Sequence, residues 1–239
     1  MVAPAIQAAL GKLPGNMLRR SGSVFYTGRS AFAQESDLYI LGLNPGGSPS
    51  VQVDNTIERN VQVRRKEPND HWSAYTDEPW EGHPAGTPGM QPRMIHMFSK
   101  LGLNPRNVSA ANVVFVRSKD EAALEKEKDE LLQASWPVHE AVLGSLGVRC
   151  ALALGTTAGR WVRQKLGAHE LIAECFEDNA RKWKSTAHRA EVGRIVVTVT
   201  HPGRADWRNP AADPRGLVCN TLNAARSLQG AAWKLMNNS

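Results

Sequence analysis

The sequence lacks most of the short motifs that assign a function at once. Its three cysteines, Cys150, Cys175 and Cys219, form no Cys-x-x-Cys pair, and its seven histidines form no His-x-x-x-His or Glu-x-x-His pair. We therefore expect no zinc site, no thiolate cluster and no bound metal. There is also no P-loop, no Gly-x-Gly-x-x-Gly and no Gly-x-Ser-x-Gly motif. Dinucleotide enzymes and triad hydrolases are accordingly disfavoured.

Long apolar runs are absent as well. No stretch approaches 18 apolar residues, and the first 20 residues lack the basic start and apolar stretch of a secretory signal. With unpaired cysteines, this pattern indicates a cytoplasmic protein without a membrane span. The formal net charge of +6 admits a polyanionic partner such as nucleic acid but does not show one.

What the sequence does contain is a set of short apolar runs that alternate with helical patterns. The runs are typical of buried strands and cover residues 38–43, 112–116, 148–154 and 194–200. Helical spacing is found at residues 1–20, 91–101, 121–132, 137–146, 158–166 and 221–236. We predict an α/β protein with one domain (residues 1–239) and a central, mostly parallel four-stranded sheet flanked by helices on both faces.

Two long polar segments interrupt this alternation. Residues 167–193 read as a connection without a strand. Residues 48–89 are rich in Pro, Gly, Asn and Asp but carry Trp72, Tyr75 and Trp80, which a disordered segment would not favour. We expect the second segment to contain short helical pieces and to fold over the mouth of a site.

Polar residues follow each apolar run. In a parallel sheet these ends lie at one edge, where open α/β sheets bind ligands. An amide at Asn44 can orient a water molecule but is not a strong base. A neutral His201 can donate a hydrogen bond to charge that develops on a leaving group. The other strand ends carry Arg117-Ser118 and Gly155–Thr157. For each of these, an ordinary turn or helix start is the alternative.

The loop after His201 contains two arginines on either side of a tryptophan. Arg204 and Arg208 can bind phosphates, and Trp207 can insert between bases. The alternative is that Trp207 packs onto the body of the protein while both arginines stay solvated.

Two motifs together resemble the uracil-DNA glycosylase superfamily. Gly42–Gly47 (GLNPGG) is similar to its first motif, in the form found in mismatch-specific and single-strand-selective members. His201–Arg204 (HPGR) is similar to its second motif. The resemblance implies excision of a base flipped out of DNA. Asn44 would place the water and His201 would stabilise the leaving base. Gly42, Leu43, Pro45 and Gly46 would line the pocket, and the loop 204–208 would enter the minor groove, with Trp207 or Arg204 as the wedge.

The chain also departs from that family. Members that read uracil usually have an asparagine at the end of the strand matching residues 112–116, where this chain has Arg117 and Ser118 as pocket residues. No aromatic residue closely follows Gly47, so Trp72, Tyr75 or Trp80 is expected to stack on the base; Tyr75 is placed in the pocket. The cysteines of the iron–sulfur branch are absent.

These observations predict a cofactor-free DNA glycosylase that acts on uracil or a related damaged base in single-stranded or mismatched DNA. One alternative is an inactive or weakly active member that binds DNA or a free nucleobase, which Arg117 would favour. Another is a small-molecule α/β enzyme that binds an anion at Gly155–Thr157.

Overall fold

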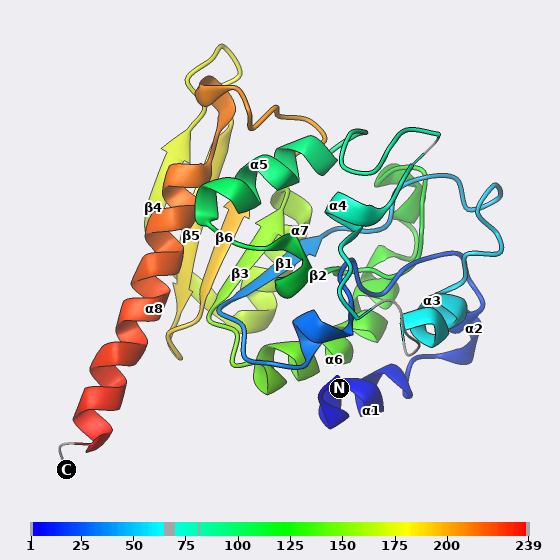
Figure 1. Cartoon of the computed structure of the whole chain (residues 1–239), viewed down its shortest axis with the longest axis horizontal. Coiled ribbons are helices and arrows are strands. Elements are labelled where there is room, and N and C mark those ends of the chain that lie inside the picture. Colours follow the sequence, from blue (N-terminus) through cyan, green and yellow to red (C-terminus); the bar gives the residue numbers. More distant parts are fainter. Residues whose placement is uncertain (1, 65–69, 81, 238–239) are drawn as a thin grey trace.

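The computed structural model describes residues 2–64, 70–80 and 82–237. Its centre is one sheet with the strand order β2-β1-β3-β6-β5-β4 (Figure 1). The strands are β1 (Leu38–Gly42), β2 (Ser109–Asn112), β3 (Cys150–Leu154), β4 (Ala168–Phe176), β5 (Lys184–Ala190) and β6 (Ile195–Val199). Strands β2, β1, β3 and β6 are parallel, whereas β5 pairs antiparallel with β6 and β4 pairs antiparallel with β5. The α/β class with flanking helices is thus confirmed.

The predicted size of four strands is wrong, because residues 167–193 form the β4–β5 hairpin. Strand β4 lies at the edge of the sheet, and most of its side chains are exposed or half-buried. Its register with β5 shifts twice, between Ala168 and Glu170 and between Leu171 and Ala173. An exposed edge and an irregular register together hide the period-two apolar pattern by which a strand is recognised.

The second predicted strand is displaced. Strand β2 ends at Asn112, whereas residues 112–116 were expected to form the strand. Val113 and Val114 leave the ladder but still donate backbone hydrogen bonds to Gly42 and Leu43, each at 2.9 Å. Residues 113–116 are buried because an N-terminal segment pairs along them, with bridges at Gly22–Val116 and Phe25–Ala111. These residues are therefore apolar because they are buried in a loop, and the sequence alone did not distinguish this run from a strand.

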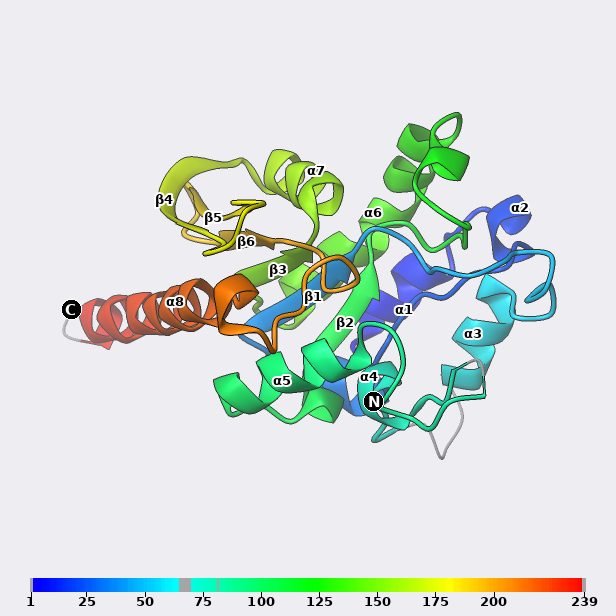
Figure 2. The same ribbon diagram turned by 90° about the horizontal axis from the view of Figure 1, so that it is seen from above.

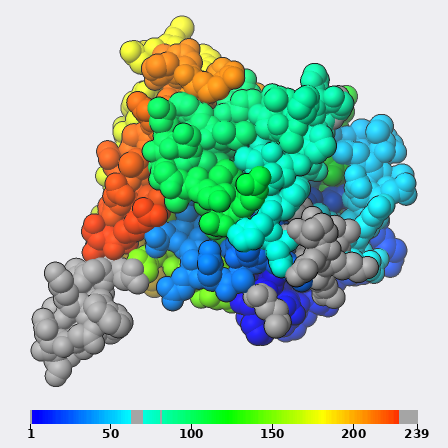
Figure 3. All heavy atoms as spheres, in the orientation of Figure 1, coloured from blue at the N-terminus to red at the C-terminus, as the bar shows by residue number. Residues whose placement is uncertain are grey.

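Helices cover both faces of the sheet (Figure 2). One face packs against α1 (Pro4–Leu10), α6 (Lys128–Ser145) and α7 (Thr156–Leu166), and the other against α4 (Ala74–Asp77), α5 (Gln91–Leu101) and α8 (Arg215–Asn237). Two short helices, α2 (Gly15–Leu18) and α3 (Ile57–Arg64), add Met17 and Ile57 to the core on the α6 side. In the space-filling view, α5 and the segment before it cover the sheet (Figure 3). The 3₁₀ turns are η1 (Arg29–Phe32), η2 (Pro105–Asn107), η3 (Ala122–Leu124) and η4 (Pro210–Ala212).

Side chains of the central strands alternate between these two cores. In β1, Tyr39 and Leu41 belong to the core on the α6 side, while Leu38 and Ile40 belong to the core on the α5 side. All five β1 residues are buried, as expected for a strand covered on both faces.

The helix predictions vary in quality. Helix α5 has the predicted bounds and ends at Gly102, whose φ of 65° suits a glycine C-cap. The first 20 residues instead form α1 and α2, and the two helices expected at 121–132 and 137–146 are mainly one helix, α6, which runs through Pro137. Among the described residues, no helix has the length and apolar character needed to cross a membrane.

Candidate functional site

A cavity of about 700 Å³ opens at the carboxyl ends of the parallel strands. Asn44 follows β1, Asn112 and Leu154 end β2 and β3, and His201 follows β6; all four line the cavity. The predicted meeting of Asn44 and His201 at one edge is therefore confirmed. Gly155 lies behind His201 rather than in the cavity wall, and Thr157 donates a hydrogen bond to Glu121 at 2.7 Å.

The amide of Asn44 is held with its nitrogen facing the protein. Asn44 Nδ2 donates to the Pro45 carbonyl at 2.8 Å and to Ser118 Oγ at 2.9 Å. A carbonyl can only accept a hydrogen bond, so the nitrogen must lie on this side. Within the described part of the chain, Asn44 Oδ1 has no hydrogen-bond partner. It is an acceptor available to a water molecule.

Asn112 is a site residue that the sequence interpretation missed. It is 7% exposed, lines the cavity, and lies directly against Gly42. A Cβ atom at position 42 would overlap with Asn112 Oδ1, so only glycine leaves room for this amide. Asn112 is the last residue of β2, so the strand ends in an asparagine and not at Arg117 or Ser118. The misplaced strand end concealed it.

Arg117 and Ser118 hold the turn that carries Asn44. Arg117 Nε donates to Ser21 Oγ at 3.2 Å, and its Nη1 donates to the Gly46 carbonyl. Both residues line the cavity, as do Gly42 and Gly46, whereas among the described lining residues Leu43 and Pro45 are missing. Arg117 therefore uses part of its hydrogen-bonding capacity on contacts within the protein.

His201 is held as a hydrogen-bond donor toward the cavity. The backbone N–H of Gly203 donates to His201 Nδ1 at 2.9 Å, so Nδ1 is an acceptor and the proton of the neutral ring is on Nε2. Burial, with a smaller contribution from the positive charge of Arg204, lowers the pKa of His201. Near neutral pH the imidazole is uncharged and presents Nε2–H.

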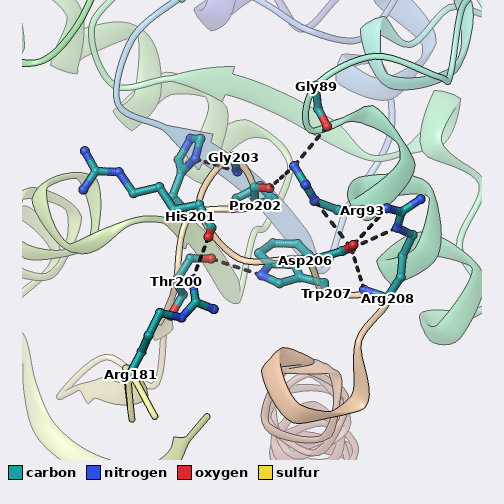
Figure 4. Close-up of polar contacts among 11 residues, drawn as sticks. Gly89, Arg93, Arg181, Thr200, His201, Pro202, Gly203, Asp206, Trp207 and Arg208 are labelled. Carbon is teal, nitrogen blue, oxygen red and sulfur yellow. Dashed lines mark hydrogen bonds and ion pairs between the residues drawn. The ribbon is translucent and has the colours of Figure 1, made fainter. Parts of the chain in front are cut away.

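Three side chains fix the backbone of the loop around His201 (Figure 4). Arg93 Nη1 donates to the Pro202 carbonyl at 2.9 Å, and Arg181 Nη1 donates to the Arg204 carbonyl at 2.9 Å. Trp207 Nε1 donates to the Thr200 carbonyl at 3.1 Å.

Trp207 is fully buried, so the structure excludes it as an inserted wedge in this conformation. The alternative in which its ring packs onto the protein holds instead. Arg204 is exposed at the turn, and Arg208 is exposed but paired with Asp206 at 2.9 Å.

Aromatic residues form one wall of the cavity. Tyr75 is buried at 4% exposure, stacks on Tyr26 with ring centroids 6.1 Å apart, and contacts Phe98 at 5.8 Å. Burial raises the pKa of Tyr75, so its hydroxyl stays protonated. The remaining aromatic lining residues are Phe25, Trp72 and Trp80. Tyr75, Trp72 and Trp80 were predicted, whereas Phe25 and Tyr26 come from a segment that carried no recognisable signal.

The segment 48–89, which was expected to fold over the mouth of the site, contributes many residues to the cavity lining. Its residues 65–69 and 81 lie outside the described part. Its described lining residues are Gln52, Asn55, Thr56, Arg59, Asn60, Trp72, Ala74, Tyr75, Glu78, Trp80 and Gly89. Among the described lining residues, four basic side chains, Arg59, Arg93, Arg117 and Lys119, outnumber two acidic ones, Glu78 and Asp120. This part of the lining therefore has a positive balance that suits an anionic ligand.

Sequence comparison finds no family model that matches this chain and no matching curated protein. Within the described ranges, no group of three or more His, Cys, Asp or Glu side chains is arranged to hold a metal ion.

Proposed function

We propose that this protein is a DNA glycosylase that flips uracil or a related damaged base out of single-stranded or mismatched DNA and hydrolyses its N-glycosidic bond. One observation carries the proposal. Asn44 Oδ1, an acceptor without a partner among the described residues, and His201, a neutral donor, line the same cavity as the amide of Asn112. The resemblance of the two motifs to uracil-DNA glycosylases points to the same reaction.

The three side chains divide the chemistry among them. The amide of Asn112 both donates and accepts, so it can pair with the edge of a flipped base. As the glycosidic C–N bond breaks, its electron pair moves onto the base, and His201 Nε2–H stabilises the negative charge that develops there. Asn44 Oδ1 accepts a hydrogen bond from the water whose oxygen bonds to the sugar carbon. That water keeps one proton as the new sugar hydroxyl and releases the other to solvent, and the departing base anion takes up a proton from solvent.

The surroundings support a flipped nucleotide. The buried Tyr75–Tyr26 pair and the other rings provide flat apolar surface against which a base can stack. Arg59, Lys119 and the exposed Arg204 provide charge for the flanking phosphates. With Trp207 buried, Arg204 is the residue of the loop that we assign to the gap left by the flipped base.

The proposal is tested by base release from single-stranded and mismatched uracil DNA. We expect release by the wild type and losses of at least about 100-fold in Asn44→Ala and His201→Leu. The matched controls are Asn223→Ala and His169→Leu, which change exposed residues outside the cavity lining. If the wild type releases no deaminated or oxidised base of any kind, the enzyme proposal is wrong.

A binding protein without glycosylase activity is the second candidate. It is favoured by the amide at position 44, since an amide activates water less strongly than a carboxylate does. In that case the protein would bind DNA with a steep dependence on salt but form no abasic product. Alanine at Arg204 would then weaken binding, whereas alanine at Asn44 would have no catalytic consequence.

A further inference from the structure

The hydroxyl of Ser118 has only one hydrogen, and the structure shows where it goes. Ser118 Oγ donates to the Asp120 carbonyl at 2.7 Å. Toward Asn44 Nδ2, 2.9 Å away, the same oxygen can therefore only accept. The Pro45 carbonyl, the other partner of Nδ2, is also an acceptor. The nitrogen of Asn44 thus faces two groups that each require a donor.

We propose that Ser118 is a positioning residue that keeps the carbonyl oxygen of Asn44 directed to the cavity and makes position 44 selective for an amide over a carboxylate. What that oxygen does with water rests on the proposed glycosylase function. A rotated amide would place Oδ1 against both acceptors and lose both hydrogen bonds. An aspartate would place a charged oxygen there, and both acceptors would repel it as long as the Ser118 hydroxyl keeps its hydrogen bond to the Asp120 carbonyl.

The surroundings of Ser118 are rigid enough for this role. Ser118 is 5% exposed, and its backbone N–H donates to the Pro45 carbonyl at 3.2 Å. The neighbouring Arg117 binds the Gly46 carbonyl, so residues 117–118 hold the turn 44–46 at three points. In this role Ser118 acts through Asn44, because its one hydrogen is already donated to the Asp120 carbonyl.

The kinetic test measures single-turnover base release and DNA affinity separately. We expect Ser118→Ala to slow release about tenfold or more without changing DNA affinity, and Ser118→Thr, which retains the hydroxyl, to restore much of the rate. In an Asn44→Ala background, Ser118→Ala should have no further effect, because both changes remove the same interaction. The matched control is Ser36→Ala, which removes a hydroxyl that donates to the Leu38 carbonyl outside the cavity lining.

With aspartate at position 44, we expect Ser118→Ala to change the release rate in the opposite direction. A carboxylate is the stronger base, yet we expect Asn44→Asp to release base more slowly than the wild type. Adding Ser118→Ala to Asn44→Asp should then raise the rate, because it removes one of the two repelling acceptors. If Asn44→Asp is faster than the wild type, or if Ser118→Ala slows release equally in both backgrounds, the selectivity for an amide is refuted.

A readout without activity separates this proposal from the proposed function. NMR can follow the exchange of the two Asn44 Nδ2 protons with solvent, which should be about tenfold faster in Ser118→Ala than in the wild type. Equal exchange in both proteins would overturn the role of Ser118, whether or not base is released. Equal release rates in wild type and Ser118→Ala would overturn it while leaving the glycosylase function intact. An inactive wild type with slow, Ser118-dependent exchange would refute only the glycosylase function.

Discussion

At the scale of single residues, backbone groups help to set which atoms of the site face the cavity. The Pro45 carbonyl holds the nitrogen of Asn44, and the Gly203 N–H holds Nδ1 of His201. Neither contact uses a charged partner. As a result, Asn44 offers the cavity a neutral acceptor and His201 offers it a neutral donor. The acceptor suits a water molecule, and the donor suits an anion that develops during the reaction.

The first residue-scale prediction concerns pH. Because the pKa of His201 is lowered from its ordinary value of 6.5, the imidazole gains a proton only on acidification below that value. A proton on Nδ1 would face the N–H of Gly203 and displace the ring, so base release should stay constant down to about pH 6.5 and fall below it. Single-turnover rates across pH check this. Arg204→Ala should move the fall to higher pH, because it removes a positive charge, while Arg189→Ala, in the β4–β5 hairpin, should not. A midpoint above pH 6.5 in the wild type would contradict the assignment.

The second concerns Gly42, which leaves room for Asn112. In Gly42→Ala the new methyl group must displace the amide of Asn112. We expect base release to fall about 10- to 100-fold, with little change in DNA affinity, since phosphate contacts are untouched. Asn112→Ala should reproduce this loss. Gly216→Ala is the control, because a Cβ atom there meets open space. Full activity in Gly42→Ala would remove Asn112 from the site.

At the scale of elements, the His201 loop is held between two neighbours. Arg93 reaches it from helix α5, and Arg181 reaches it from the β4–β5 hairpin. Arg93 also donates to the Gly89 carbonyl at 3.1 Å and pairs with Asp206 at 3.5 Å. The β4–β5 hairpin therefore contributes to the site, because its Arg181 holds the His201 loop from the side opposite α5.

Removing the Arg93 contact should loosen the loop without unfolding the protein. We expect Arg93→Ala to slow base release about tenfold and to lower the free energy of unfolding by only about 1 kcal/mol. Urea unfolding and single-turnover kinetics measure the two effects. Arg226→Ala breaks a comparable contact, with Asp37 at 2.8 Å, outside the cavity lining and should leave release unchanged. Equal losses of activity in both variants would show that the effect is not specific to the loop.

At the scale of the whole molecule, the core on the α6 side encloses a histidine. His139 is fully buried on the α6 side, 2.8 Å from the hydroxyl of Tyr39, and it packs among Phe115 and Trp136. Burial lowers the pKa of His139 to about 3. The folded protein therefore holds this ring neutral at pH values where the unfolded chain protonates it.

Stability should consequently fall on acidification. The unfolded chain takes up a proton near pH 6.5 that the folded chain does not accept until about pH 3, so the free energy of unfolding decreases as the pH drops between these values. From about pH 7 to about pH 5 we expect His139 to contribute a loss of roughly 2 kcal/mol. Urea unfolding of wild type and His139→Gln measures this, and the variant should lose less. An equal pH dependence in both proteins would contradict it.

The sequence by itself determined the parts of the protein that depend on local chemistry. Buried apolar runs define β1 and β6 within a residue of their bounds, glycines end α5 and α7, and the edge rule for parallel sheets brings Asn44 to His201. The amide and imidazole of the candidate site were therefore predictable.

Only the tertiary structure decided the features that depend on distant partners. Residues 113–116 are buried by the N-terminal segment and not by a strand ladder. Their apolar sequence therefore could not show that β2 ends at Asn112. The Thr200 carbonyl and the surrounding core take Trp207 out of solvent, and Ser118 sets the orientation of Asn44. Hydrophobic periodicity records how far a side chain is buried but not which segment buries it, and hydrogen bonds between distant residues leave no periodic pattern.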